Sequence, residues 1–308
     1  MPVVAIILPV FLVILLGGVL TRTRFLDAEL IAGLNRLTYY VGLPAYLFSS
    51  IAGAAFGGGR AAALFGVMSG ASLLVLFVGY GVAKLRRVPA ESVGSFLHAA
   101  IRGNLAYIGL PVVTLALAAH GADGLRQEAL LAMAPLVVVT NTLGVLLLLI
   151  GHAKPGPAML RSLVWQLATN PLLLASAAGV ACAAGGVGLP AWLTQSVAVT
   201  GQLALPLALL CIGGTLVVMS LRGKRTTAFL ASLLKVAAAP LLGWPLARWA
   251  GLSPDELRIV LLFLATPTAA ASFTLAGKLG GDEALAASSV VLSTALSILS
   301  LSAVLTLA

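Results

Sequence analysis

Charged side chains are scarce in this sequence, and few of them lie inside its long apolar runs. Of the 308 residues, 60% are hydrophobic and 9% are charged, whereas soluble proteins average about 25% charged residues. A soluble fold could not cover so much apolar surface, so the composition predicts an all-α polytopic membrane protein. The long apolar runs argue against an outer-membrane barrel, whose strands alternate over about 10 residues.

Carboxylates and cysteines are absent from the places where several chemistries would need them. The two cysteines, Cys182 and Cys211, form neither a disulfide framework nor a metal site. No carboxylate is predicted at the membrane midplane, so neither a carboxylate proton relay nor an acidic cage for a cation is evident. The nine acidic residues all fall at predicted segment ends or in loops: Asp27, Glu29, Glu91, Asp123, Glu128, Asp255, Glu256, Asp282 and Glu283.

Catalytic and metal-binding motifs are missing as well. The sequence has no HExxH, nucleophile elbow, P-loop or Cys/His cluster. We therefore expect no enzyme activity, no bound metal and no cofactor. Transport coupled to H⁺ or Na⁺ remains open. The net charge of +9 does not indicate a nucleic-acid partner, because the basic residues lie mostly in short loops, where they set membrane orientation.

Apolar segments follow one another with short connections, and about ten of them are long enough to span a membrane. The first is expected to be a retained span rather than a signal peptide, because it lacks a basic start and is followed by Thr-Arg-Thr-Arg. The predicted spans are 2–20, 30–52, 62–84, 92–119, 127–151, 162–184, 190–220, 227–250, 255–277 and 284–307.

An internal repeat appears when the sequence is shifted by 162 residues. Pro9 then falls on Pro171, and Arg60 falls on Arg222. Each copy holds five spans, and an odd number places the second copy upside down in the membrane, as in many secondary transporters. We expect one integral membrane domain built from residues 1–152 and 153–308.

The fourth span of each copy is interrupted near its middle. The first interruption is predicted between Arg102 and Pro111, and the second at Thr266-Pro267-Thr268, because Gly costs a helix about 1 kcal/mol and Pro about 3 kcal/mol. Backbone freed at membrane depth must find partners within the protein, so such breaks often line a substrate site. A proline-kinked helix without a ligand is the alternative.

Polar residues near the breaks are the candidates for ligand binding. Two half-helix N-termini together with Arg102 favour an anion. Arg102 lies four residues after His98 and either functions there or extends to the membrane surface, as Arg36 and Lys235 are expected to do. Ordinary hydrogen bonding between helices is the alternative for the neutral residues. The substrate-binding candidates are Arg102, Asn104, Tyr107, Pro111, Asn141, Thr266, Pro267 and Thr268, and the weaker ion-binding candidates are Thr142, Ser293 and Thr294.

The distribution of Lys and Arg over the loops predicts the orientation. The odd-numbered loops are richer in these residues than the even-numbered ones, which places the odd loops in the cytoplasm and both termini outside an inner (plasma) membrane. The odd loops contain Arg22, Arg24, Lys84, Arg86, Arg87, Lys154, Arg161, Arg222, Lys224, Arg225 and Lys278, and the even loops contain Arg60, Arg126, Arg248 and Arg258.

Several of these segments resemble the auxin efflux carrier family. Residues 7–17 and 34–44 resemble its opening, residues 102–111 its fourth span, and residues 205–216 its seventh span. The resemblance implies a five-plus-five inverted repeat related to the bile acid–sodium symporter fold. It also implies a scaffold of two spans per repeat, a transport unit of three, and broken, crossing fourth and ninth helices that bind substrate.

The function that this resemblance implies is secondary transport, by elevator-type alternating access and in the efflux direction. The substrate would be a small organic anion, such as an auxin-like aromatic acid or a dicarboxylate, and the partners would be membrane lipid and a second copy in a homodimer. Unlike plant members, the chain has only residues 151–161 between its fifth and sixth spans. A sodium-coupled bile-acid-like symporter and a transport-inactive receptor or sensor are the alternatives.

Overall fold

The computed structural model describes residues 2–52, 59–149, 161, 164–165, 168–219 and 225–307. Helices make up almost all of these residues, and long helices alternate with shorter ones joined end to end. In the first half they are α1 (Pro2–Arg22), α2 (Ala28–Leu37), η1 (Thr38–Gly42), α3 (Leu43–Ala52), α4 (Gly59–Leu85), α5 (Ala90–Ile101), η2 (Leu105–Gly109), α6 (Leu110–Ala119), η3 (Asp123–Leu125) and α7 (Arg126–Leu149). In the second half they are α9 (Pro171–Ala184), α10 (Ala191–Gln202), α11 (Ala204–Val218), α12 (Arg225–Leu233), η4 (Leu234–Ala238), α13 (Ala239–Trp249), α14 (Pro254–Leu264), α15 (Ala271–Lys278) and α16 (Glu283–Leu307).

The prediction of an all-helical, multi-pass protein is confirmed for this part of the chain. Six helical stretches are long and apolar enough to cross a membrane, and they coincide with the first, third, fifth, seventh, eighth and tenth predicted spans. The other four predicted spans consist of shorter pieces, namely α2–η1–α3, α5–η2–α6, α9 and α14–α15. The predicted boundary between the two repeats, at residue 152, lies outside the described residues.

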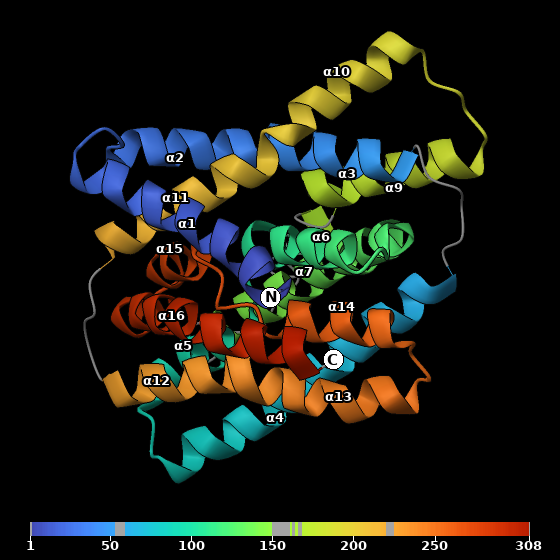
Figure 1. Cartoon of the computed structure of the whole chain (residues 1–308). Coiled ribbons are helices and arrows are strands. Elements are labelled where there is room, and N and C mark those ends of the chain that lie inside the picture. The colour runs from blue at the N-terminus through green and yellow to red at the C-terminus, as the bar shows by residue number, and fades with distance from the viewer. Residues whose placement is uncertain are drawn as a thin grey trace.

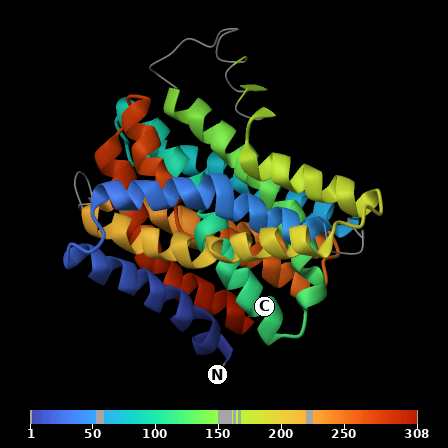
Figure 2. The same ribbon diagram turned by 90° about the horizontal axis from the view of Figure 1, so that it is seen from above.

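The helices are arranged in two layers. Figure 1 shows α1, α2, α3, α9, α10 and α11 in the upper layer, with α4, α12, α13, α14 and α16 in the lower part of the molecule. Seen from above in Figure 2, the α2–α3 and α10–α11 rods run side by side across the upper layer. Within the layers α1 packs along α11, α3 along α9, α4 along α13 and α12 along α16.

Glycine allows the closest of these contacts, between α1 and α11. A Cβ added to Gly213 would lie 1.8 Å from the Ile14 carbonyl oxygen, and one added to Gly17 would lie 2.1 Å from the Leu210 carbonyl oxygen. Side chains at these positions would force the two backbones apart. Small residues at helix contacts are typical of membrane proteins, where lipid is as apolar as the helix surface and association depends on close packing.

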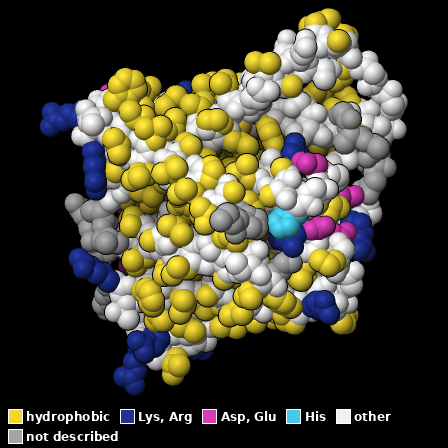
Figure 3. Space-filling model, viewed as in Figure 1, with side chains coloured by type: hydrophobic (Ala, Val, Ile, Leu, Met, Phe, Trp, Pro, Cys, Tyr) yellow, Lys and Arg dark blue, Asp and Glu magenta, His cyan; other side chains and the backbone are white. Residues whose placement is uncertain are grey.

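The surface matches the expected membrane environment. Figure 3 shows a broad hydrophobic face, with Lys and Arg side chains gathered along the edge where Figure 1 places the α1–α2 and α4–α5 turns. Acidic, basic and His side chains occur together near the opposite edge. Basic side chains gathered at one edge of an apolar surface are typical of multi-pass membrane proteins.

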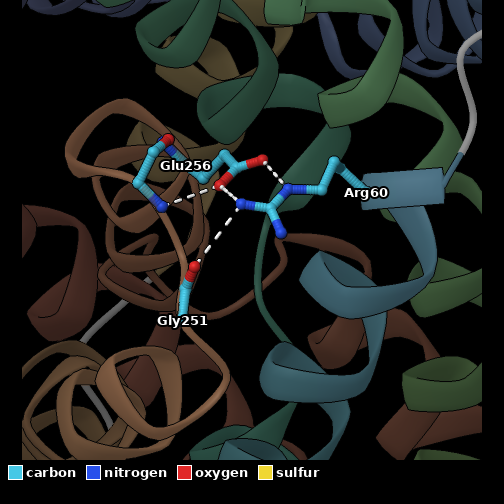
Figure 4. Close-up of polar contacts among 4 residues, drawn as sticks. Arg60, Gly251 and Glu256 are labelled. Atoms are coloured by element: carbon cyan, nitrogen blue, oxygen red, sulfur yellow. Dashed lines mark hydrogen bonds and ion pairs between the residues drawn. The ribbon is translucent and has the colours of Figure 1, made fainter.

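One ion pair joins the two halves at that opposite edge. Arg60, at the start of α4, donates from Nε to Glu256 Oε1 over 2.6 Å and from Nη2 to Glu256 Oε2 over 2.8 Å (Figure 4). Glu256 also accepts from the backbone N–H of Ser253, and the Ser253 side chain accepts from the N–H of Glu256, which forms a capping box. The pair therefore fixes the start of α14, the helix that leads to the second interruption.

Candidate substrate-binding site at the helix crossover

Both predicted interruptions are present, at slightly different residues from those expected. α5 ends at Ile101, and Arg102 is extended with φ −84° and ψ 95°. The chain resumes as a π-helix, η2, which continues directly into α6. The expectation that the break extends to Pro111 was wrong, because the helix has resumed at Leu105 and runs without a gap to Ala119. The missing N–H of Pro111 falls directly after the π-helical turn η2, a distortion of the kind that accommodates proline within a helix.

The two interruptions lie against each other as a short antiparallel crossing. The backbone N–H of Asn104 donates to the carbonyl of Pro267 over 2.7 Å, and the N–H of Ala269 donates to the carbonyl of Arg102 over 2.9 Å. Gly103 and Thr268 form the isolated bridge between these two bonds. Each broken helix thus supplies hydrogen-bond partners for the backbone groups that the other has freed, which lipid could not do.

Gly103 is needed at the centre of this crossing. A Cβ added there would lie 2.7 Å from Thr266 Oγ1, 3.0 Å from Lys235 Cε and 3.2 Å from Leu105 Cδ2. Any side chain would push the two extended stretches apart. The same contacts show that Lys235 is part of the crossover.

Arg102 is bonded within the protein. Its Nε donates to Asn141 Oδ1 on α7 over 2.7 Å, and its Nη1 donates to Ser272 Oγ on α15 over 3.3 Å. Its guanidinium is therefore held at the crossover, between α7 and α15. Asn141 was a sequence candidate, whereas Ser272 was missed, because it lies beyond the break in a segment that resembles any other polar helix start.

The position of Lys235 differs from the one predicted from the sequence. It was expected to extend to the surface, but its side chain is only 3% exposed, and Nζ donates to the carbonyl of Leu264 over 2.6 Å. Leu264 ends α14, where the helix dipole places partial negative charge. The distance of Lys235 from its predicted helix end gave no sign of this, because only packing decides which face of η4 meets α14.

The neutral candidates divide into those at the crossover and those beside it. Thr266 Oγ1 donates to the carbonyl of Phe263 over 2.6 Å, and Thr268 Oγ1 donates to the carbonyl of Ala99 over 2.8 Å. The N–H of Thr268 donates to Ser293 Oγ over 3.0 Å, which brings α16 to the crossing. Asn104 is buried, and its side chain does not cap η2.

Three other candidates lie away from the paired backbone. The Tyr107 hydroxyl donates to the carbonyl of Asn35 over 3.3 Å and so connects η2 with α2 of the upper layer. Thr294 bonds to the carbonyl of Val290 in its own helix. Thr142 is half-buried on α7, one residue after Asn141.

Positive charge at the crossover has no acidic counterpart among the described residues. The described part of the chain contains the ion pairs Arg60–Glu256, Arg126–Asp123 and Arg258–Asp255, and none of these pairs involves Arg102 or Lys235. The N-termini of η2 and α15 also point to the crossing without side-chain caps. Two cations and two uncapped helix starts make this place favourable for an anion.

Comparison with known proteins identifies the family of the chain. The sequence pattern of the membrane transport protein family matches residues 2–305. The chain belongs to this family. The family includes the auxin efflux carriers, so the resemblance seen in the sequence is confirmed. No curated protein matches the chain. Membership of the membrane transport protein family makes the chain a membrane transporter, in agreement with the expectation that it is not an enzyme.

Two surface hollows in the described part of this membrane transport protein lie apart from the crossover. One, of about 750 Å³, is lined by Gly33, Arg36, Leu37, Tyr40 and Val41 on the exposed side of α2 and η1. A second, of about 480 Å³, is lined by residues between Asp27 and Arg36. Neither includes a crossover residue, so the site is defined by the buried polar groups and not by these hollows.

Proposed function

We propose that this membrane transport protein is a secondary active transporter of a small organic anion, such as an auxin-like aromatic acid or a dicarboxylate. The observation that carries the proposal is a pair of cations at the crossing of two broken helices, the buried Lys235 and the half-buried Arg102, neither of which pairs with a carboxylate of the described residues. A buried cation without a carboxylate is unfavourable until a negative group approaches it. An anionic substrate would supply that group.

The substrate would lie at the crossover. Arg102 and Lys235 would supply the charge, and the Asn104 amide and the helix starts at Leu105 and Ala271 would supply neutral donors. Asn141 would orient Arg102 through their hydrogen bond. The remaining substrate-binding candidates, Tyr107, Pro111, Thr266, Pro267 and Thr268, would shape the site or hold its backbone.

The two layers support an elevator-type mechanism. The upper layer, α1–α3 with α9–α11, would be the scaffold, and the two broken helices with α4, α7, α12, α13 and α16 would move as the transport unit. The packing also supports a five-plus-five inverted repeat. α1 packs on α11 while α3 packs on α9, so the first and second spans of one half contact the second and first spans of the other. A two-fold relation between the halves requires this exchange.

Orientation, location and assembly follow from the same proposal. The basic edge in Figure 3 would face the cytoplasm, which places the protein in an inner (plasma) membrane with both termini outside. Two copies would associate as a homodimer, as the family resemblance implies. Efflux is the direction that the resemblance implies, although an alternating-access carrier moves its substrate along whatever gradients drive it.

Reconstitution into liposomes tests the proposal. We expect radiolabelled malonate, malate or indole-3-acetate to be taken up by vesicles containing the protein, and Arg102→Gln to reduce this uptake. Uptake that requires sodium would favour the sodium-coupled alternative, with Asn104, Asn141 and Thr142 as ligands and Ser293 and Thr294 nearby. Binding without flux would favour a receptor. Equal affinity for the acid and its neutral amide, at a pH where the acid is ionised, would contradict an anion site.

A further inference from the structure

A row of polar residues runs along α5 to the crossover. Ser92, Ser95, His98 and Arg102 are spaced by three, three and four residues, so they lie on one side of the helix. The row covers about 15 Å at the helical rise per residue. Ser92 Oγ donates to Asp282 Oδ2 over 2.7 Å at the end of the row where α16 begins. The row therefore connects an end of the transport unit with Arg102.

His98 is the residue in this row that has no role in the proposed anion site. It is only 1% exposed, and neither Nδ1 nor Nε2 has a hydrogen-bond partner in the part of the chain that the structure describes. A neutral imidazole has one donor and one acceptor, and its protonated form has two donors. The hydroxyl of Ser95, one turn away, is also buried without a partner.

Glycines on the neighbouring elements leave room for these two side chains. A Cβ added to Gly144 of α7 would lie 2.9 Å from His98 Cδ2 and 3.0 Å from Nε2. A Cβ added to Gly281, just before α16, would lie 2.7 Å from Ser95 Oγ. Two separate elements thus pack closely on the two unpartnered polar groups, although nothing there bonds to them.

The charges around His98 are few. The elements packed against α5 are α4, α7, α12, η4, α15 and α16. Arg102 is the charged group that acts on His98, and Lys235 of η4 approaches the chain at Gly103, one residue after Arg102. The other ionisable residues of these elements lie near their ends: Arg60, Tyr80, Lys84, Glu91, Arg126, Glu128, Arg225, Lys278 and Glu283.

We propose that His98 binds a proton that is transported together with the anion, so that the protein is a proton–anion symporter. The inference rests on the proposed function. With the site empty, burial of the ring opposes a positive charge on His98, and Arg102, one turn away, opposes it further. A carboxylate bound at Arg102 offsets that charge and favours the imidazolium. By linkage, a protonated His98 strengthens anion binding by the same factor.

The proton balance of a transport cycle is simple. A proton leaves water on the side where the anion binds and forms an N–H bond on the imidazole of His98. After the transport unit has moved, the anion leaves, Arg102 again opposes the second charge, and the proton returns to water on the other side. Ser92 and Ser95 provide a polar approach from the Asp282 end. The proton and the anion cross in the same direction, which the sum of their two gradients decides.

The test uses proteoliposomes with a trapped pH-sensitive dye and radiolabelled malonate, at pH values where malonate stays fully ionised. We expect uptake by the wild type to carry about one proton per anion beyond a protein-free control, and malonate affinity to rise up to about tenfold per pH unit lowered, the limit for one linked proton. His98→Gln should still take up malonate down its own gradient, with a lower affinity than the wild type at low pH, but should lose both the accompanying proton and the pH dependence.

Two further variants keep the result interpretable. His120→Gln removes a histidine at the far end of α6, where its Nδ1 lies 2.8 Å from the carbonyl oxygen of Ala116 in its own helix. This variant should behave as the wild type does. Ser95→Ala should slow proton-coupled uptake without changing the number of protons per anion. If His98→Gln does not fold, the other two proteins still decide. Ser95→Ala with an unchanged rate of malonate uptake, together with a wild type that takes up malonate without protons, would overturn the proposal. Uptake of malonate with no proton, or with a proton that His98→Gln retains, would also overturn it. Absence of uptake of every acid in the panel would instead contradict the transport function.

Discussion

Replacing Lys235 with methionine is expected to change stability and anion binding in opposite directions. Methionine has a similar length but no charge. The Lys235 ammonium is buried and donates to the carbonyl of Leu264 over 2.6 Å, and no carboxylate of the described residues pairs with it. Lys235 therefore lowers the stability of the empty protein and raises its affinity for an anion.

The expected magnitudes follow from these contacts. Loss of a hydrogen bond to a charged group costs about 1.5–3 kcal/mol, while an uncompensated buried ion costs several kcal/mol. The variant should therefore be more stable by about 1 kcal/mol or more, which corresponds to a rise in Tm of about 2 °C or more. For an anion about 6 Å from Nζ, at an effective dielectric constant of about 20, the attraction to the ammonium is about 2.8 kcal/mol. Its loss in the variant would raise Kd roughly a hundredfold.

Thermal unfolding of the ligand-free protein in detergent and equilibrium binding of malonate or indole-3-acetate measure the two effects. Lys278→Met, at the exposed end of α15, is the matched control and should change neither quantity. A Lys235→Met protein that melts earlier and binds the anion with unchanged affinity would refute the reasoning, because Lys235 would then act only as a cap for the end of α14.

Other substitutions at the crossover have equally definite expectations. Gly103→Ala should reduce flux strongly and destabilise the protein by about 1–3 kcal/mol, because its Cβ meets Thr266 and Lys235. Gly81→Ala, with open space around it, should instead stabilise α4 by up to about 1 kcal/mol. Equal effects of the two substitutions in flux and unfolding assays would contradict this expectation. Asn104→Ala should weaken anion binding by about 1–3 kcal/mol, and a Kd equal to that of the wild type would remove Asn104 from the site. Pro267→Ala should impair flux more than Pro111→Ala, since only Pro267 lies in the crossing; the reverse order in purified proteins of equal yield would argue against the crossing as the centre of transport.

Much of the site could be predicted because local sequence controls where a membrane helix breaks. Gly103 and Pro267 weaken helices wherever they occur, and lipid cannot satisfy the freed backbone. The location of both interruptions, and the roles of Arg102 and Asn141 as polar residues beside them, therefore followed from the printed sequence. The error at Pro111 has a local cause too, since a proline that a helix accommodates and one that ends a helix look alike in a sequence.

What the sequence by itself determined is the kind of protein: an all-helical membrane protein, interrupted in two of its segments, with its carboxylates kept near segment ends. Apolar length and helix-breaking residues decide these features independently of any distant contact. Only the tertiary structure decided that the interruptions pair through Asn104 and Pro267, and that Ser272 and Lys235 join them. Lys235 is the clearest case, because a lysine eight residues into a predicted span reaches either water or a buried carbonyl depending on which helix packs over it. That choice is made by residues more than twenty positions away, at the end of α14.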